Sequence, residues 1–335
     1  MHVLIRVDGG PTRGFGHLVR TSTVANRLVD RGHRVTCLTH TPDAARSVYA
    51  DGIPITELRR DDEVEATLER IDETGADVLV SDLPDTSIED QRRFTESDAV
   101  FVVVRDDVGG TVCCDVLLNS HIYAAADAYD WIGDEPVWCV GGEFNIVNEE
   151  IRAVAAREPR WRHPPERALV TMGGSDVRGT TPDVLRAFAD FELALDVVVG
   201  PGFDDETVAA IEEARRTVTP TVDVHRDPDD FGELMYRADF AVTALGLTAY
   251  ELLAVGTPIV GTPQAADQEP KAETLREEAV AIVLAADATV SQINEAITTM
   301  MSDESSRRRF QRRGRELVSV DGVDRFVSCL ERLAG

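Results

Sequence analysis

The feature that most constrains the fold of this chain is the alternation of short β-rich runs with segments of helical periodicity. In the first half, apolar runs at 2–7, 34–38, 77–81, 100–104 and 115–118 predict strands, and the spacing of apolar residues predicts a helix at 17–30. Gly32 stands where the glycine that ends such a helix belongs. Strands that alternate with helices indicate βαβ units and a parallel sheet.

The same alternation restarts after a proline-rich segment at 158–166, which is the best candidate for a linker. Strands are predicted at 168–171, 194–199, 222–225, 240–243 and 259–261, with helices between them and two more helices at the end of the chain. At 335 residues the chain is longer than most single cores. We therefore predict an α/β protein of two facing, doubly wound Rossmann-like domains, 1–157 and 158–335, which bind ligands in the cleft at the carboxyl ends of their strands.

The composition restricts the classes of partner. The formal net charge is −27, and Lys271 is the one lysine of the chain. An acidic surface repels nucleic acids and anionic lipids, and it is typical of a protein that stays soluble in concentrated salt, as in a halophile. There is no basic, apolar leader and no run of about 18 apolar residues. We expect a cytoplasmic protein with no nucleic-acid partner and no membrane insertion, and nothing indicates a protein partner.

The cysteines and histidines do not have the spacing of a metal site. The five cysteines include no C-x-x-C, and the seven histidines lack zinc-binding spacing with acids or cysteines. Buried, reduced thiols are the expected state. No metal and no cofactor are predicted.

The first candidate loop runs from Asp8 to His17 and reads DGGPTRGFGH. It lies between a strand and a helix, where α/β folds bind anions, but Val19 replaces the third glycine of a dinucleotide fingerprint. A hydride-transfer cofactor is therefore disfavoured. The positive helix start should keep the imidazole of His17 neutral, so that it can serve as a general base; the alternative is that it only caps the helix. Asp8 either orients this imidazole or is an ordinary turn residue.

The second candidate loop is Gly173-Gly174-Ser175-Asp176, after the first strand of the second domain. Paired glycines let backbone amides approach a ligand, and the hydroxyl of Ser175 can donate to a phosphate oxygen. The alternative is a tight turn in which Asp176 caps the next helix.

The third region runs from Gly246 through Leu247 and Thr248 to Glu251. The free amides of a helix start suit a diphosphate, and Glu251, one turn later, can accept both hydroxyls of a ribose. The alternative for Glu251 is a capping box with the amide of Thr248. Downstream, Gln268 can bond sugar hydroxyls, and Lys271 is either retained for a phosphate or carboxylate or a chance survivor.

Taken together, these regions resemble the family that contains the UDP-sugar hydrolase of pseudaminic acid biosynthesis and the SpsG-like spore-coat polysaccharide proteins. The resemblance spans nearly the whole chain, and more distantly it extends to the GT-B glycosyltransferase that makes the lipid-linked muropeptide. Besides the glycine loop and the block from Gly246 to Gln268, the matching opening is R-x-D-G…G-x-G-H-x-x-R, formed by Arg6, Asp8, Gly9, Gly14, Gly16, His17 and Arg20.

The resemblance implies a GT-B fold and a metal-independent reaction on a UDP-sugar. By this resemblance His17 helps to activate water for attack on the anomeric carbon, with release of UDP and free sugar. Glu251 would hold the ribose, and Gly174, Ser175 and the segment 246–248 would hold the diphosphate. Gly14, Gly16, Arg20, Gly173, Gln268 and Lys271 complete the predicted binding set.

Three functions stay open at this level. The first is hydrolysis of a UDP-sugar, and the second is a glycosyltransferase in which an acceptor hydroxyl replaces water. The third is a subunit that binds a nucleotide sugar without catalysis. The sequence does not identify the sugar, the pathway or the oligomeric state.

Overall fold

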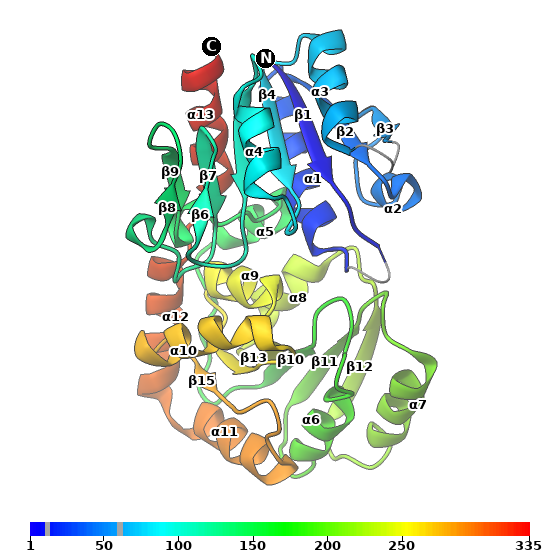
Figure 1. Cartoon of the computed structure of the whole chain (residues 1–335). Helices are drawn as coiled ribbons and strands as arrows, with labels where there is room; N and C mark the ends of the chain where they lie inside the picture. Colours follow the sequence, from blue (N-terminus) through cyan, green and yellow to red (C-terminus); the bar gives the residue numbers. More distant parts are fainter. Residues whose placement is uncertain (11–13, 59–62) are drawn as a thin grey trace. The chain divides into compact units, whose positions relative to one another are not determined.

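The computed structural model of the protein describes residues 1–10, 14–58 and 63–335. These residues form two compact units, of which the first contains Met1–Val147 and Ser319–Gly335 and the second contains Asn148–Val318. Each unit has a parallel sheet with flanking helices (Figure 1). The predicted α/β class and the doubly wound sheets are thus confirmed.

The sheet of the first unit has the strand order β3-β2-β1-β4-β5-β7-β9, and all its neighbours are parallel. A small second sheet pairs β6 with β8. The order turns back at β1, which lies between β2 and β4, so the carboxyl ends of β1 and β4 form the edge where doubly wound folds bind ligands. The strands are β1 (His2–Val7), β2 (Arg34–Thr39), β3 (Ile55–Glu57), β4 (Val78–Asp82), β5 (Val100–Val104), β6 (Thr111–Val112), β7 (Val116–Asn119), β8 (Asp130–Trp131) and β9 (Val137–Val140).

Alternate residues of these strands pack into two different apolar clusters, one on each face of the sheet. Val3 and Ile5 of β1 pack in one apolar cluster with α1 and α13, whereas Leu4 packs in another with residues of α3 and α4. This is the period of two expected of a sheet that is covered on both faces. The helices of this unit are α1 (Gly16–Asp30), α2 (Pro42–Arg46), α3 (Glu63–Thr74), α4 (Ile88–Thr95), η1 (Ala126–Ala128), η2 (Gly142–Phe144) and α13 (Gly322–Ala334). Gly32 has a φ of 83° just after α1, as expected of a helix end.

The sheet of the second unit has the order β12-β11-β10-β13-β14-β15, again with parallel neighbours. Its strands are β10 (Arg167–Thr171), β11 (Ala194–Val199), β12 (Thr221–Arg226), β13 (Phe240–Ala244), β14 (Ile259–Thr262) and β15 (Ile282–Val283). Its helices are α5 (Glu149–Ala155), α6 (Thr181–Ala187), α7 (Asp205–Ala214), α8 (Phe231–Arg237), α9 (Leu247–Val255), η3 (Ala266–Gln268), α10 (Glu269–Glu277), α11 (Val290–Ser302) and α12 (Glu304–Leu317). Within the part of the chain that the structure describes, none of the helices is both long and apolar enough to span a bilayer.

The division of the chain differs from the expected domains, 1–157 and 158–335, in two respects. The second unit begins at Asn148, because α5 packs against α8 and α9 rather than against the first sheet. The chain also ends with three helices after α10 rather than two, and the last of them, α13, returns to the first unit (red in Figure 1). Its buried residues Val323, Phe326, Val327 and Leu330 recur at helical spacing, and this apolar stripe completes the core beside α1.

We predict that Phe326→Ala lowers the free energy of unfolding of the first unit by about 3–5 kcal/mol, because the ring is fully buried in that core. Leu333 lies on the same helix but is 42% exposed, so Leu333→Ala should change stability by less than about 0.5 kcal/mol. Urea unfolding of the two variants measures both effects. Equal losses of stability would show that α13 does not belong to this core.

Candidate functional site

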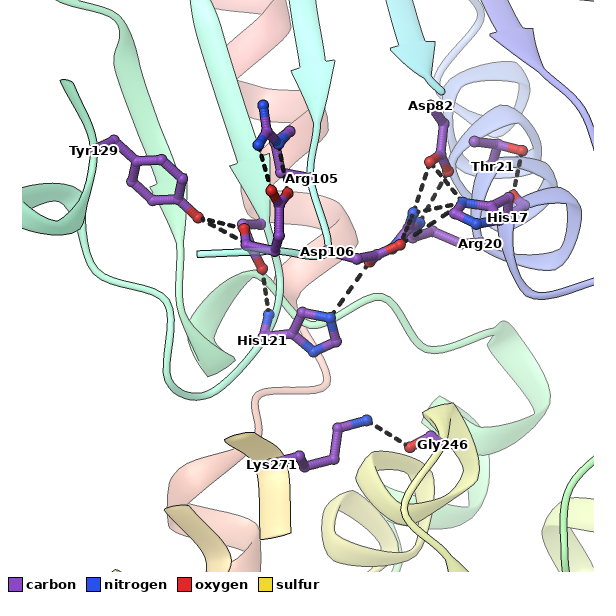
Figure 2. A network of polar contacts seen from close by, with 12 residues as sticks. His17, Arg20, Thr21, Asp82, Arg105, Asp106, His121, Tyr129, Gly246 and Lys271 are labelled. Atoms are coloured by element: carbon purple, nitrogen blue, oxygen red, sulfur yellow. Dashed lines mark hydrogen bonds and ion pairs between the residues drawn. The ribbon is translucent and has the colours of Figure 1, made fainter. Parts of the chain in front are cut away.

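Polar side chains gather at the carboxyl edge of the first sheet, where four neighbouring strands end. Asp8 follows β1, Asp82 is the last residue of β4, Asp106 follows β5 by two residues, and His121 follows β7 by two residues. Because parallel strands end at one edge, residues far apart in the sequence meet here. Figure 2 shows the resulting contacts: Asp82 and Asp106 meet two residues of α1, His17 and Arg20, and His121 meets Asp106.

His17 is the second residue of α1, and Asp82 holds its ring. Nδ1 of His17 lies 2.9 Å from Oδ1 of Asp82, whose side chain is 1% exposed, whereas the imidazole is 25% exposed. Carboxylate oxygens only accept, so this contact fits a proton on Nδ1. Nη2 of Arg20 lies 3.0 Å from the same nitrogen, but it can only donate, so with Nδ1 protonated it makes no hydrogen bond there. Among the hydrogen bonds of the described residues, none involves Nε2 of His17, which therefore offers its lone pair.

Arg20 forms hydrogen bonds with both Asp82 and Asp106 and so links the two carboxylates. Its Nε and Nη2 donate to the two oxygens of Asp82 at 3.0 and 2.6 Å, its Nη2 donates to Oδ2 of Asp106 at 3.2 Å, and its Nη1 donates to Oδ1 of Asp106. The guanidinium is buried, and a buried charge requires such partners. Arg20 was predicted to bind ligand. In this structure its nitrogens donate hydrogen bonds to the carboxylates of Asp82 and Asp106.

Asp106, which accepts hydrogen bonds from Arg20, also contacts a second histidine, His121. Burial alone would raise the pKa of Asp106, but the charge of Arg20 and the hydrogen bonds of His121 and Arg20 hold it well below its usual range. Nε2 of His121 lies 3.4 Å from Oδ1 of Asp106, and the ring of His121 stacks on Tyr123. The carboxylate of Asp106 is therefore a fixed negative charge at every pH near neutrality.

The expectation that the surroundings of His17 lower its pKa requires correction. The hydrogen bond with Asp82 raises the pKa of His17, and this effect, with the charge of Asp82, outweighs burial and the charge of Arg20, which lower the pKa. The local helix start was visible in the sequence, but the carboxylate that reverses its effect comes from another strand. His17 acts as a proton acceptor only above this raised pKa.

Asp8 does not make the contact with His17 that was one of its two predicted roles. Its Oδ2 accepts from Arg6 at 2.7 Å, and its Oδ1 accepts from Thr39 and from the amide of His40 at 2.9 and 2.6 Å. Burial opposes ionisation, but these hydrogen bonds and the charge of Arg6 lower the pKa of Asp8 to about 2. Asp82 occupies the place that Asp8 was expected to fill.

The glycine loop itself is described at both ends. Gly10 and Gly14 exchange backbone hydrogen bonds of 2.9 and 2.7 Å, and Gly16 begins α1. Gly14 has a φ of 83°, which favours glycine. Pro11, Thr12 and Arg13 of the predicted loop lie outside the described residues.

One cluster near this edge has metal-ligating groups, although no metal was predicted. Ligand atoms of Asp8, His40 and Glu63 lie within 4.8 Å of one another. The guanidinium of Arg6 already bonds both carboxylates, at 2.7 Å to Asp8 and 2.6 Å to Glu63. A cation at this place would compete with Arg6.

In the second unit, the predicted glycine loop and the predicted helix start follow neighbouring strands, β10 and β13. A Cβ added at Gly174 or at Gly246 would meet nothing within 4 Å, so a ligand has room to approach both backbones. Gly174 also accepts from the amide of Gly202 at 2.8 Å, which ties the loop to the one after β11. Ser175 is exposed beside it.

Asp176 has the capping role that was one of its alternatives. Its carboxylate oxygens accept from the amides of Thr180 and Thr181 at 2.8 and 2.7 Å, at the start of α6. It is 7% exposed. The ligand-binding interpretation of this loop is thus confined to Gly173, Gly174 and Ser175.

Helix α9 begins at Leu247, and its cap residue Gly246 supplies no side chain to the free amides. Glu251 is the fifth residue of the helix, so the predicted capping box with Thr248 does not form. No hydrogen bond to the carboxyl of Glu251 is found within the described residues. Burial, and then the negative charge of Glu150, raise the pKa of Glu251 to about 7.

Lys271 and Gln268 both support loops at this edge. Lys271 is 3% exposed, and its Nζ donates to the carbonyl of Gly246 at 2.8 Å (Figure 2). The same nitrogen lies 4.1 Å from the centre of the ring of Tyr250. Oε1 of Gln268 accepts from the amide of Gln264 at 2.9 Å. Lys271 therefore places a positive charge directly at the start of α9.

No individual role was predicted for Asp82, Asp106 or His121, which complete the site of the first unit. Asp82 follows the strand predicted at 77–81, and Asp106 follows the one predicted at 100–104. An acidic residue within two positions of the end of a buried parallel strand was the signal that could have found Asp82 and Asp106.

Asp82→Asn should lower the pKa of His17, since it removes the charge while keeping an oxygen that can accept from Nδ1. Asp107→Asn is the matched control, because Asp107 pairs with Arg105 instead. Titration of the histidine ring signals by NMR reports both. An unchanged pKa of His17 in Asp82→Asn would contradict this assignment.

Glu251→Gln should stabilise the protein more at pH 8 than at pH 5. The pKa of Glu251 in the folded state, about 7, lies above the reference value of 4.5. Ionisation of Glu251 therefore lowers the free energy of unfolding only at high pH. The loss is absent at pH values below 4.5 and complete above about pH 7. It amounts to at most about 3 kcal/mol. Urea unfolding at the two pH values measures it, and a stabilisation that does not depend on pH would contradict the burial of this carboxyl.

Comparison with known proteins supports the resemblance seen in the sequence. No family model matches the chain. The chain is 25% identical to the spore coat polysaccharide biosynthesis protein SpsG of Bacillus subtilis, over 99% of its own length and 98% of that protein. It is 27% identical to the UDP-2,4-diacetamido-2,4,6-trideoxy-beta-L-altropyranose hydrolase of Campylobacter jejuni, over 53% of its own length and 62% of the hydrolase.

Among solved structures, MurG of Acinetobacter baumannii matches with a TM-score of 0.68 and 16% identity, over 99% of each chain. At this identity the match shows the fold alone. The chain is therefore similar to SpsG over its full length and to the Campylobacter hydrolase over part of it, and its fold is the GT-B fold.

Proposed function

We propose that this protein is an enzyme that hydrolyses a UDP-sugar at the bond between the anomeric carbon and the phosphate oxygen. The observation that carries the proposal is the contact of His17 with buried Asp82, which leaves Nε2 of a partly exposed imidazole as a proton acceptor. The similarity to a named UDP-sugar hydrolase supports the substrate class. The similarity to SpsG supports a place in polysaccharide biosynthesis.

In the proposed reaction, Nε2 of His17 takes a proton from water while the water oxygen attacks the anomeric carbon. The bond from that carbon to the phosphate oxygen breaks, and its electron pair leaves with UDP. The imidazolium that forms is stabilised by the carboxylate of Asp82, at 2.9 Å from Nδ1. Arg20 holds Asp82 in place, so it acts as a positioning residue.

The second unit would hold the nucleotide. Open backbone at Gly174 and Gly246, the uncapped start of α9 and the positive charge of Lys271 suit a diphosphate. The same groups would stabilise the charge that develops on departing UDP. The carboxyl of Glu251, to which no described residue donates a hydrogen bond, would bond the ribose hydroxyls.

A glycosyltransferase is the second candidate, because a base at the position of His17 can equally take a proton from a sugar hydroxyl. Here an acceptor hydroxyl would replace water, with His17 in the same role. The two candidates differ in whether UDP is released without an acceptor. Purified protein should be incubated with UDP-sugars, including the substrate named for the Campylobacter hydrolase, with and without acceptor sugars.

The reaction in ¹⁸O-labelled water identifies the bond that breaks. Attack of water on the anomeric carbon places the label in the sugar and leaves UDP unlabelled, as measured by mass spectrometry. UDP release that strictly requires an acceptor, or label in UDP, would refute the proposed hydrolysis.

His17→Gln should reduce UDP release by at least about 100-fold, because general-base catalysis typically contributes this much. Its affinity for UDP, measured by calorimetry, should be unchanged. His33→Gln is the matched control, since His33 follows the other end of α1 and contacts Glu331. Full turnover in His17→Gln would exclude the base.

A further inference from the structure

The first sheet ends in a strand whose outer side is open. Strand β9 is last in the order of this sheet, so among the described strands it pairs with β7 alone (Figure 1). The amides of Val137 and Gly141 donate at 2.8 and 2.9 Å to carbonyls of the β7 segment. Because successive residues of a strand turn their N–H and C=O groups to opposite sides, those of Trp138 and Val140 point outward. The outer side of β9 therefore offers main-chain donors and acceptors to another chain.

Strand β9 differs from the other edges of the two large sheets in its lack of charge. It has four residues, Val-Trp-Cys-Val. The edge strand β12 carries Asp223, His225 and Arg226, β3 has three residues and ends in Glu57, and β15 has only two residues. Charge and short length are the usual devices that keep an edge strand from pairing. Of these four edges, β9 is the one of more than three residues that carries no charged side chain.

Apolar side chains are exposed beside this edge. Val137, the first residue of β9, is 38% exposed, and Trp131 of β8 is 43% exposed, with its ring centre 5.8 Å from that of Trp138. An open cavity of about 440 Å³ continues the surface and is lined by residues of β9, η2 and α13, among them Trp138 and Phe144. A contiguous surface of this kind marks a place of interaction.

The charges around the edge differ between its two ends. A Cβ on Gly322 would clash with the backbone of Asn145, so α13 begins beyond the carboxyl end of β9. Arg325 follows one turn later; it is exposed, lines the cavity, and joins no ion pair within the part of the chain that the structure describes. Asp134 and Glu135 are exposed just before the amino end of β9. A positive charge thus lies near one end of the strand and two negative charges lie near the other.

We propose that two copies of this chain associate through β9, with the two strands paired antiparallel about a twofold axis. In this arrangement the amino end of one β9 lies opposite the carboxyl end of the other. The acidic loop of each copy then meets Arg325 of the other, so the same ion pair forms twice. A basic partner would be repelled by this arginine, whereas a second copy brings Asp134 to it. The association joins the two sheets into one and covers Val137.

The first measurement is the mass of the wild-type protein in solution, by size-exclusion chromatography with light scattering over a dilution series. Roughly 1 M salt is used, because the Debye length is then about 3 Å and the repulsion of two chains of charge −27 is screened. We expect twice the chain mass of 36.6 kDa. Hydrogen exchange at the amides of Trp138 and Val140 should slow in the dimer. A single-chain mass over the whole series would overturn the proposal.

Charge reversal tests the antiparallel arrangement. Arg325→Asp and Asp134→Arg should each weaken the dimer at least about tenfold, since each places like charges opposite one another at both ends of the interface. An equimolar mixture of the two variants should dimerise again, because each copy then finds the opposite charge in the other. A mixture that stays monomeric, or single variants that dimerise as well as the wild type, would refute this pairing.

Val137→Asp places a charge at the centre of the proposed contact and should give a monomer. Val177→Asp is the matched control, because Val177 is 73% exposed in the second unit and should leave the dimer unchanged. Both side chains are exposed, so neither variant should disturb the core. A dimer of Val137→Asp as stable as the wild type would show that the interface lies elsewhere.

Discussion

The site of the first unit depends on one buried guanidinium that two carboxylates share. Arg20 is 6% exposed and bonds both Asp82 and Asp106, so two protein carboxylates compensate its charge. Removing either carboxylate would leave a buried charge partly unpaired, which is costly. The bridge therefore fixes the ends of two strands relative to α1. The orientation of His17, and with it the proposed chemistry, follows from this one interaction.

Much of the architecture could be predicted because it depends on patterns of apolar and turn residues that are local in the sequence. The alternation of strands and helices, the glycine that follows α1 and the glycine loops after β1 and β10 are each visible within about ten residues of sequence. His17 and Arg20 were found for the same reason, since both lie in the first turns of the helix that follows the first loop. Local periodicity and turn chemistry carry this information.

The partners of these residues could not be predicted, because the order of strands in the sheet decides them. Asp8 directly follows β1 and Asp82 is the last residue of β4, but only the position of β4 beside β1 brings Asp82 to His17. The return of α13 to the first unit also depends on tertiary packing. The raised pKa of His17 is a consequence of the same non-local contact, which outweighs burial and the charge of Arg20.

The central claim is that Asp82, held by Arg20, fixes the proton of neutral His17 on Nδ1 and leaves Nε2 as the acceptor. Nitrogen NMR of protein labelled with ¹⁵N-histidine distinguishes a protonated from an unprotonated ring nitrogen directly. Above the pKa of His17, we predict a protonated Nδ1 and an unprotonated Nε2. A proton on Nε2 under these conditions would contradict the account, because the nitrogen assigned to receive the proton of water would already carry one.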